Sequence, residues 1–156
     1  MKKSFIIALG ALSIGMLVLF SGCKDDKQQQ PPSFVSNVDK PVWSAPQATN
    51  MTSSMTAVVK VDLEEQYPKV AADFLLDDND LLGAFAGEQC LGVTSLVDGY
   101  FFIYINEPEE ENSFVTLRYY SAHYKNIFEA EDVFPFRNDD HVGTIAEPFI
   151  PAFVVE

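Results

Sequence analysis

Apolar and polar side chains alternate along several stretches of the chain after residue 50. Between residues 55 and 63 the odd-numbered positions are all apolar, and the even-numbered positions are polar except Val58. A period of two places successive side chains on opposite faces, which is typical of a half-buried β-strand. This alternation, together with short apolar runs bounded by turn residues, predicts seven or eight strands. They cover residues 55–63, 81–86, 90–97, 100–106, 114–121, 124–130, 133–136 and 149–155.

Two dipeptides predict tight turns between these strands. Gly87-Glu88 suits a two-residue type II′ hairpin, because the first central position of that turn needs a positive φ. Asp98-Gly99 is a second turn signal. The strand that follows it, residues 100–106, is apolar on both faces and is therefore expected near the centre of a sheet.

The best helix candidate spans residues 63–76, but Pro68 lies inside it, which predicts a loop or a short helical turn. No segment sustains a helical period over three turns. The sequence therefore predicts an all-β domain over residues 41–156. Frequent turns between short strands favour an antiparallel β-sandwich, Ig-like or jelly-roll-like, of about 7–9 strands.

The N-terminal residues follow a different pattern. Two lysines precede an uncharged, mostly apolar run over residues 5–20, which is shorter than the roughly 20 apolar residues that a membrane span needs. Small residues then lead into Cys23, an arrangement that resembles the lipobox of bacterial lipoproteins. The resemblance implies that residues 1–22 are a lipoprotein signal peptide and that Cys23 carries a diacylglycerol, with no other cofactor expected. An ordinary secretory signal with a chance cysteine is the alternative.

The residues after Cys23 sharpen the predicted location. Lys24, Asp25 and Asp26 resemble the export signal that sends Bacteroidota lipoproteins across the outer membrane to the cell surface. A solvated charge pair at the start of a linker is the alternative. Residues 23–40 are rich in Gln and Pro, which predicts a flexible tether after the acylated cysteine. The expected location is the outer membrane, lipid-anchored and facing the cell exterior.

The net charge and the number of cysteines exclude several classes of partner and site. The chain has 156 residues, with 23 acidic against 10 basic residues and a formal net charge of −13. Binding to a phosphate backbone needs clustered positive charge, so nucleic acid is not an expected partner. Electrostatic docking on an anionic membrane surface is disfavoured for the same reason. Two cysteines exclude a multi-disulfide scaffold and a four-cysteine zinc site.

Several pieces of the pattern resemble a small β-sandwich module of secreted and surface proteins of Bacteroidota. Its signature is close to GAF-x-G-x-x-C-x-G-V, then YF-x-x-x-Y, then GT-x-x-x-PF. The first piece is GAFAGEQCLGV at residues 83–93, a looser second piece begins at residue 100, and the third is GTIAEPF at residues 143–149. The resemblance covers about residues 50–155. It implies a fold and a setting, and because the module's activity is unassigned, it implies no catalytic residues.

Asp77, Asp78 and Asp80 form the densest acidic cluster and are weak calcium candidates. Calcium takes six to eight oxygen ligands, and carboxylates in a turn can supply several of them. The cluster lacks the spaced D-x-D-x-D-G pattern, which favours a solvated loop before a strand. We therefore expect no bound metal.

The residues that could support catalysis are sparse. His123 and His141 are the only histidines, and each lies in loop-like sequence. Cys90 lies inside an apolar strand and has no disulfide partner if Cys23 carries lipid, so an inert, buried thiol is expected. The G-x-S-x-G, H-E-x-x-H and P-loop patterns are absent from the sequence. We expect no enzymatic activity and assign no catalytic residue.

Aromatic residues give the remaining candidate for a binding face. Arg118 and Tyr120 alternate with apolar residues of their strand, and Tyr104 joins them if residues 100–106 pair with 114–121 in an antiparallel hairpin. Tyrosine rings and an arginine fork suit sugar rings or a peptide. The alternative is a second buried face, which an aromatic neighbour of Tyr104 favours.

The sequence as a whole predicts a non-catalytic, lipid-anchored binding or docking module on the cell surface. Phe85 is expected in its core, and Trp43 is expected to pin the first strand. The expected setting is an accessory of an outer-membrane nutrient-uptake (SusCD-like) complex, with a TonB-dependent transporter and a SusD-like lipoprotein as partners. The alternative is a stand-alone glycan-binding or adhesive surface lipoprotein.

Overall fold

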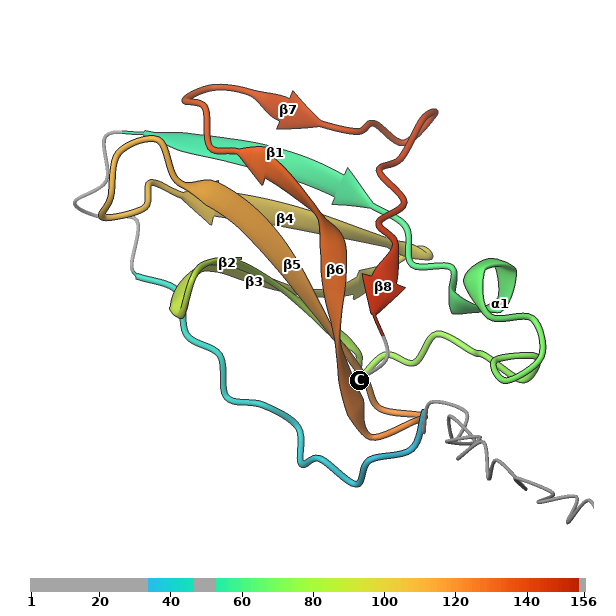
Figure 1. Cartoon of the computed structure of the whole chain (residues 1–156). Helices are drawn as coiled ribbons and strands as arrows, with labels where there is room; N and C mark the ends of the chain where they lie inside the picture. The colour runs from blue at the N-terminus through green and yellow to red at the C-terminus, as the bar shows by residue number, and fades with distance from the viewer. Residues whose placement is uncertain (1–33, 47–52, 155–156) are drawn as a thin grey trace, which may run out of the picture. The chain divides into compact units, whose positions relative to one another are not determined.

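The computed structural model describes residues 34–46 and 53–154, all of which belong to the unit Pro31–Glu156 (Figure 1). The predicted signal peptide over residues 1–22, the lipid-bearing Cys23 and the export signal after it lie outside the described residues. Within the described part of the chain, no helix is long and apolar enough to cross a membrane.

Eight strands and one short helix make up the described domain, so the all-β prediction is confirmed. The elements are β1 (Ser54–Val59), α1 (Leu63–Gln66), β2 (Leu81–Ala86), β3 (Gln89–Val97), β4 (Tyr100–Asn106), β5 (Phe114–Ser121), β6 (Asn126–Pro135), β7 (His141–Val142) and β8 (Phe153–Val154).

The strands form one sheet in the order β7-β1-β4-β3-β2-β5-β6-β8. Neighbours are antiparallel except β1 and β7, which run parallel. The sheet is strongly curled, like an open half-barrel (Figure 1). The sequence predicted a sandwich of separate sheets, and here the structure differs. Residues 89–95 of β3 pair with β2, and its last two residues pair with β4, so one bent strand with a bulge joins both halves.

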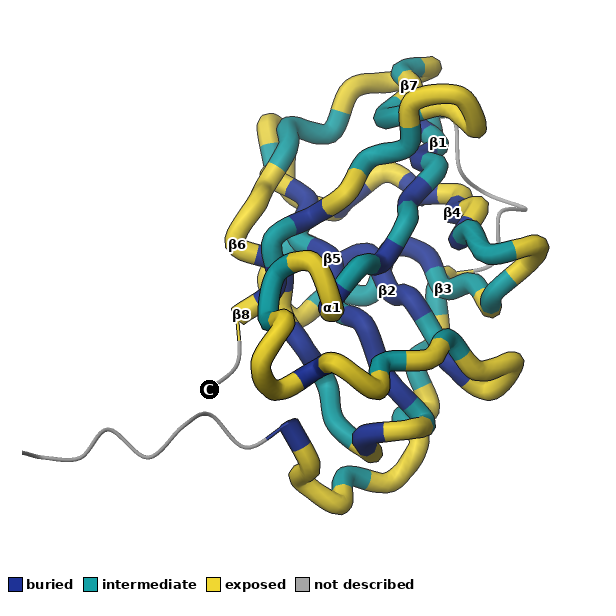
Figure 2. Tube along the Cα trace, turned by 90° about the vertical axis from the view of Figure 1, so that its right-hand side faces the viewer, coloured by how far each residue is buried: buried dark blue, intermediate teal, exposed yellow. Residues whose placement is uncertain are grey.

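The hydrophobic core fills the inside of the curl. Buried positions concentrate along the strands (Figure 2), and within each strand they follow the period of two. The inward positions of β1 are those that the alternation predicted. The largest fully buried side chains include Met55, Leu82, Leu91, Phe101, Ile103, Ile105, Leu117, Tyr119, Phe128 and Phe153.

The predicted helical region over residues 63–76 reduces to α1, a single turn. The side chain of Asp62 accepts a hydrogen bond from the backbone N–H of Glu65 at 3.0 Å and thereby caps its N-terminus. Pro68 follows closely and cannot continue the helix. The prediction of a short helical turn is confirmed, and β1 consequently ends at Val59 rather than at residue 63.

Both predicted turns connect the strands that the sequence assigned to them. Gly87 has φ +57°, as the first central position of a type II′ turn requires, and links β2 to β3. Asp98 (φ 49°) and Gly99 (φ 83°) both have positive φ, which is the type I′ pattern, and link β3 to β4. These two hairpins bring three of the predicted strands together in register.

The C-terminal part departs from the prediction. β6 is continuous where two strands were expected, and the predicted strand over residues 149–155 is reduced to β8 at the sheet edge, after Pro151. Residues 143–152 cross from β7 at one edge of the sheet to β8 at the other. The segment therefore connects the two edges of the half-barrel.

Gly143 and Phe149 fix this crossing segment. Gly143 has φ +72°, and a Cβ there would lie 2.5 Å from the backbone N of Phe149, so only glycine allows the close approach. The N–H of Phe149 donates to the carbonyl of Val58 at 2.9 Å. Its ring packs edge-on against Phe134 of β6, with centroids 5.8 Å apart. The GTIAEPF motif thus ties β1 to β6.

Residues 34–46, here called the strap, precede β1 and lie against the sheet. Phe34 is 5% exposed and belongs to the core, where its ring contacts Tyr124 and Phe128. The N–H of Val38 donates to the carbonyl of Lys125 at 2.7 Å. Residues 34–40, which the sequence assigned to the flexible tether, therefore pack on the domain, because a buried aromatic ring anchors them.

Candidate functional site: the outer face of the sheet

The structure separates the residues predicted to share a binding face. Strands β3 and β2 lie between β4, which carries Tyr104, and β5, which carries Arg118 and Tyr120. The expected antiparallel pairing of β4 with β5 is wrong. The reason is that β4 has β1 on its other side, with Thr56 opposite Tyr104, so the loop after β4 leads to a distant strand.

Tyr120 lies on the outer side of β5 and is nevertheless only 5% exposed. Burial raises the pKa of its phenol, and the nearby charge of Asp39, a strap residue, raises it further. Tyr120 is therefore covered and is not available as part of an open binding face.

Phe85 is buried as predicted, at 3% exposure, but its position is unexpected. It lies on the outer side of β2, apart from the main core cluster. Trp43 of the strap packs edge-on against it, with ring centroids 5.4 Å apart. Trp43 thus contacts β2 rather than the first strand. Gly83 makes room for this packing, because a Cβ there would lie 2.6 Å from the Phe85 ring and 3.0 Å from Trp43.

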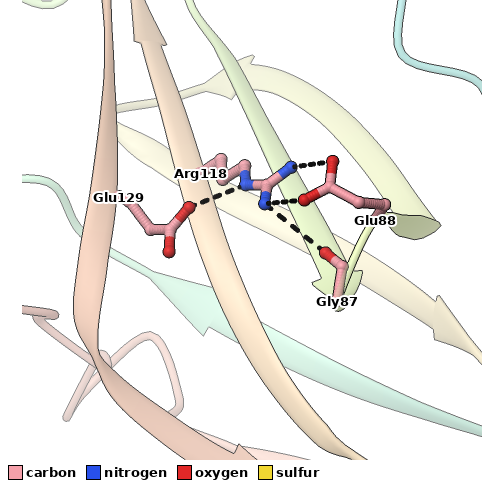
Figure 3. A network of polar contacts seen from close by, with 4 residues as sticks. All are labelled: Gly87, Glu88, Arg118 and Glu129. Atoms are coloured by element: carbon pink, nitrogen blue, oxygen red, sulfur yellow. Dashed lines mark hydrogen bonds and ion pairs between the residues drawn. The ribbon is translucent and has the colours of Figure 1, made fainter.

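Arg118 also packs against Phe85, and all three of its guanidinium nitrogens have partners (Figure 3). Its Nε donates to Glu129 at 2.9 Å, and its Nη2 donates to Glu88 at 3.1 Å and to the carbonyl of Gly87 at 3.4 Å. Its Nη1 donates to Glu88 at 3.5 Å. The guanidinium carbon lies 4.5 Å from the centroid of the Phe85 ring.

The setting of Arg118 identifies it as a structural clamp. Partial burial lowers the pKa of Arg118, but the hydrogen bonds and charges of Glu88 and Glu129 outweigh that effect and raise it. A guanidinium engaged in this way has no free fork for a carboxylate or a sugar. We call the outer surface around Phe85, Arg118 and Tyr120, together with Trp43 of the strap packed against it, the covered half.

The outer side of β4 presents a different surface. Tyr104 is 50% exposed and Phe102 is 41% exposed, and Tyr100 precedes them on the same side, with its ring centroid 6.2 Å from that of Phe102. Alternation places these three residues on one side of the strand, with backbone positions about 7 Å apart in one line. The pattern of apolar and polar residues did not predict this exposed row, because residues 100–106 are apolar at both odd and even positions and so show no solvent-facing side.

The strands beside β4 extend this surface. Register places Thr56 and Val58 of β1 opposite Tyr104 and Phe102, and Val97 of β3 opposite Tyr100. Ser95 lies two residues before Val97 and shares its side of the sheet. Gly92 lets β3 approach β4, since a Cβ there would collide with the carbonyl oxygen of Tyr104. The aromatic face, as used below, consists of Thr56, Val58, Ser95, Val97, Tyr100, Phe102 and Tyr104.

The calcium candidates do not converge. Asp80 is fully buried and accepts hydrogen bonds from the Tyr119 hydroxyl at 2.6 Å and from the backbone N–H groups of Asp77 and Ala122. Burial raises its pKa, although these hydrogen bonds oppose the shift. The carboxylate of Asp77 instead accepts from Asn79, which lowers the pKa of Asp77. Among the described residues, no group of three or more potential ligands could hold a metal ion.

The histidines and the cysteine have ordinary structural contacts. The Nδ1 of His141 lies 2.6 Å from the hydroxyl of Thr56, at the margin of the aromatic face. His123 lies 3.6 Å from Asp73 and stacks edge-on against Tyr124. Cys90 is partly buried, and burial raises the pKa of its thiol, which disfavours the reactive thiolate.

Comparison with known proteins adds no relative: no family model, no curated protein and no solved structure matches the chain. The fold and the site therefore define only a β-rich domain with an exposed aromatic surface.

Proposed function

We propose that this chain is a non-catalytic binding module, held on the outside of the outer membrane by a lipid on Cys23, whose contact surface is the aromatic face. One observation carries the proposal: Phe102 and Tyr104 are about half exposed on a strand whose other side is fully buried. Contiguous exposed aromatic surface on a soluble domain marks an interaction site. Aromatic residues are also enriched where proteins bind partners.

The charge distribution supports the same surface. The chain carries a net charge of −13, yet the outward positions of β1 and β4 and those of residues 93–97 in β3 include no charged residue. The central part of an interaction surface is typically depleted of charge and rimmed by polar groups. A neutral aromatic area within a strongly acidic chain fits that description.

The proposed anchor places the domain close to the membrane. The strap begins at Phe34, so the residues between Cys23 and Phe34 could span at most about 36 Å when fully extended. Within that reach the module would act as an accessory of a nutrient-uptake complex, beside a TonB-dependent transporter. The second candidate, a stand-alone glycan-binding or adhesive lipoprotein, is favoured by the row of rings on β4.

The test of this proposal is site-specific photocrosslinking on intact cells. A photoreactive phenylalanine analogue replaces Tyr104 in one strain and Phe114 in a control strain. Phe114 is 59% exposed on β5, outside the aromatic face. We expect a discrete crosslinked product, protein or glycan, at position 104 and none at position 114. Absence of a product at 104, or equal products at both positions, contradicts the proposal.

The anchor is tested separately by Cys23→Ala. The variant is expected to lose labelling by a fatty-acid analogue and to remain unprocessed or leave the membrane fraction. Replacing Asp25 and Asp26 with Ala is expected to keep the lipid and to reduce cleavage of the protein by external protease on intact cells. Unchanged labelling and partitioning of Cys23→Ala would exclude the lipid anchor.

A further inference from the structure

We infer that the occupant of the aromatic face is an extended, neutral glycan chain, an inference that rests on the binding role proposed above. The shape of the surface is the first argument. The face lies on the outside of the curl, while the core fills the inside. A convex strip cannot enclose a small molecule, since small-molecule sites are concave. It can contact a polymer that lies along it.

The spacing of the rings is the second argument. Tyr100, Phe102 and Tyr104 occupy alternate positions of one strand, so their backbone positions repeat about every 7 Å over roughly 14 Å, and the first two ring centroids lie 6.2 Å apart. Each ring offers a flat apolar face with a negative quadrupole, which attracts the weakly positive C–H groups of a pyranose. A row of such rings matches a ligand that is itself a chain of similar rings.

Polar groups around the rings are the third argument. A sugar hydroxyl both donates and accepts hydrogen bonds, and so do the hydroxyls of Ser95, Tyr100 and Tyr104 in and around the row. His141 contacts Thr56 at the margin. A purely apolar protein contact would leave these hydroxyls buried without partners, which costs free energy. A hydroxyl-rich ligand satisfies them.

The charged residues near the aromatic face favour neutral glycans over anionic ones. The turn residue Asp98 precedes Tyr100, and Asp139, whose N–H donates to the carbonyl of Ser54, lies near the other end of β4. Both are exposed carboxylates that can accept hydrogen bonds from sugar hydroxyls and repel anionic groups. Lys60, the residue after β1, pairs with Asp62 at 3.5 Å. Uronate, sulfate and phosphate polymers are therefore disfavoured.

The experiment is affinity electrophoresis of the full lipidated chain, kept soluble in a polyoxyethylene detergent that carries no sugar. Native gels contain amylopectin, arabinoxylan, galactomannan, mixed-linkage β-glucan or, as the anionic contrast, polygalacturonate. The variants are Tyr104→Ala, Phe102→Ala and Tyr104→Phe, which keeps the ring, with Phe114→Ala as the control for an exposed aromatic residue elsewhere. Thermal melting of each variant verifies that it remains folded.

We expect retardation by at least one neutral polymer and none by polygalacturonate. Tyr104→Ala and Phe102→Ala are expected to weaken binding about tenfold, whereas Tyr104→Phe and Phe114→Ala retain it. No retardation by any neutral polymer, retardation by polygalacturonate alone, or equal retardation of Tyr104→Ala overturns the inference. If the photoreactive analogue at position 104 then still crosslinks to a protein on cells, the binding role survives and only the glycan occupant is wrong. If position 104 also yields no crosslink, both the binding role and the glycan occupant are wrong.

Discussion

The covered half and the aromatic face are two parts of the same outer surface, and both carry aromatic residues at outward positions. In the covered half, Trp43 packs on Phe85 and the clamp of Arg118 closes over it. On the aromatic face, Phe102 and Tyr104 stay about half exposed. The residue types are alike, and what differs is whether another part of the chain packs over them. Burial of an outward aromatic residue in this domain is thus a long-range property.

A glycine contributes to the packing in each of the two regions. Gly83 gives Trp43 and Phe85 the space to pack, so the covered half is built to receive the strap. On the other half, Gly92 allows close approach of β4 to β3 beneath Tyr104. Two of the three glycines of the GAFAGEQCLGV motif therefore serve opposite outcomes: Gly83 helps to bury a ring, and Gly92 supports a strand that exposes one.

The largest expected effect is on Phe85. Phe85→Ala removes a buried ring that contacts both Trp43 and Arg118 and is expected to lower the free energy of unfolding by about 3–5 kcal/mol. A urea titration measures it, with Phe102→Ala on the aromatic face as the matched control. A loss below about 1 kcal/mol would mean that the strap and the clamp do not bury Phe85.

The next effect is on the strap. Trp43→Ala removes a partly buried ring and is expected to lower the free energy of unfolding by about 2 kcal/mol. Trp43 is the single tryptophan, so its fluorescence reports on the strap. Phe85→Ala is expected to shift its emission to longer wavelength before global unfolding. An unchanged spectrum would show that Trp43 does not depend on Phe85.

A smaller effect is expected for the clamp. The carboxylate partners of Arg118 are largely exposed, so its ion pairs contribute little, and most of its contribution comes from packing over Phe85. Arg118→Ala is therefore expected to cost about 1–2 kcal/mol and Arg118→Met less, because Met keeps much of the packing. Thermal melts at low and high salt measure both. Equal losses in the two variants would assign the stabilisation to the charges instead.

The smallest effects are expected on the aromatic face. Phe102→Ala and Tyr104→Ala remove rings that already face solvent, so each is expected to change the free energy of unfolding by less than about 0.5 kcal/mol. The measurement is the same urea titration. A loss of about 2 kcal/mol or more for either variant would indicate that the face is covered by the protein itself, and the comparison of the two halves would fail.

The sequence predicted local structure better than strand order. The alternation of β1 and the turns at Gly87 and Asp98 depend on neighbouring residues, and all are found in the structure. The position of β4 beside β1 depends on contacts between residues 42 to 52 positions apart, which a period of two does not encode. The predicted trio of Tyr104, Arg118 and Tyr120 failed for that reason.

Exposure was equally hard to predict for both halves. Residues 34–40 were assigned to the tether together with the Gln- and Pro-rich residues before them, yet Phe34 enters the core. Along β4 the apolar residues at both parities suggested two buried sides, whereas the outer side faces solvent. Composition cannot distinguish an outward aromatic ring that the strap covers from one that faces solvent, because the difference lies in tertiary packing.

The measurement that tests the central comparison most directly is hydroxyl-radical footprinting of the purified full chain, read out by peptide mass spectrometry. Radicals modify aromatic side chains according to their exposure, so Phe102 and Tyr104 on the aromatic face can be compared directly with Phe85 and Tyr120 on the covered half. The account predicts that the first pair is modified several-fold faster than the second. Equal modification of the two pairs, or faster modification of Phe85 and Tyr120, would contradict it.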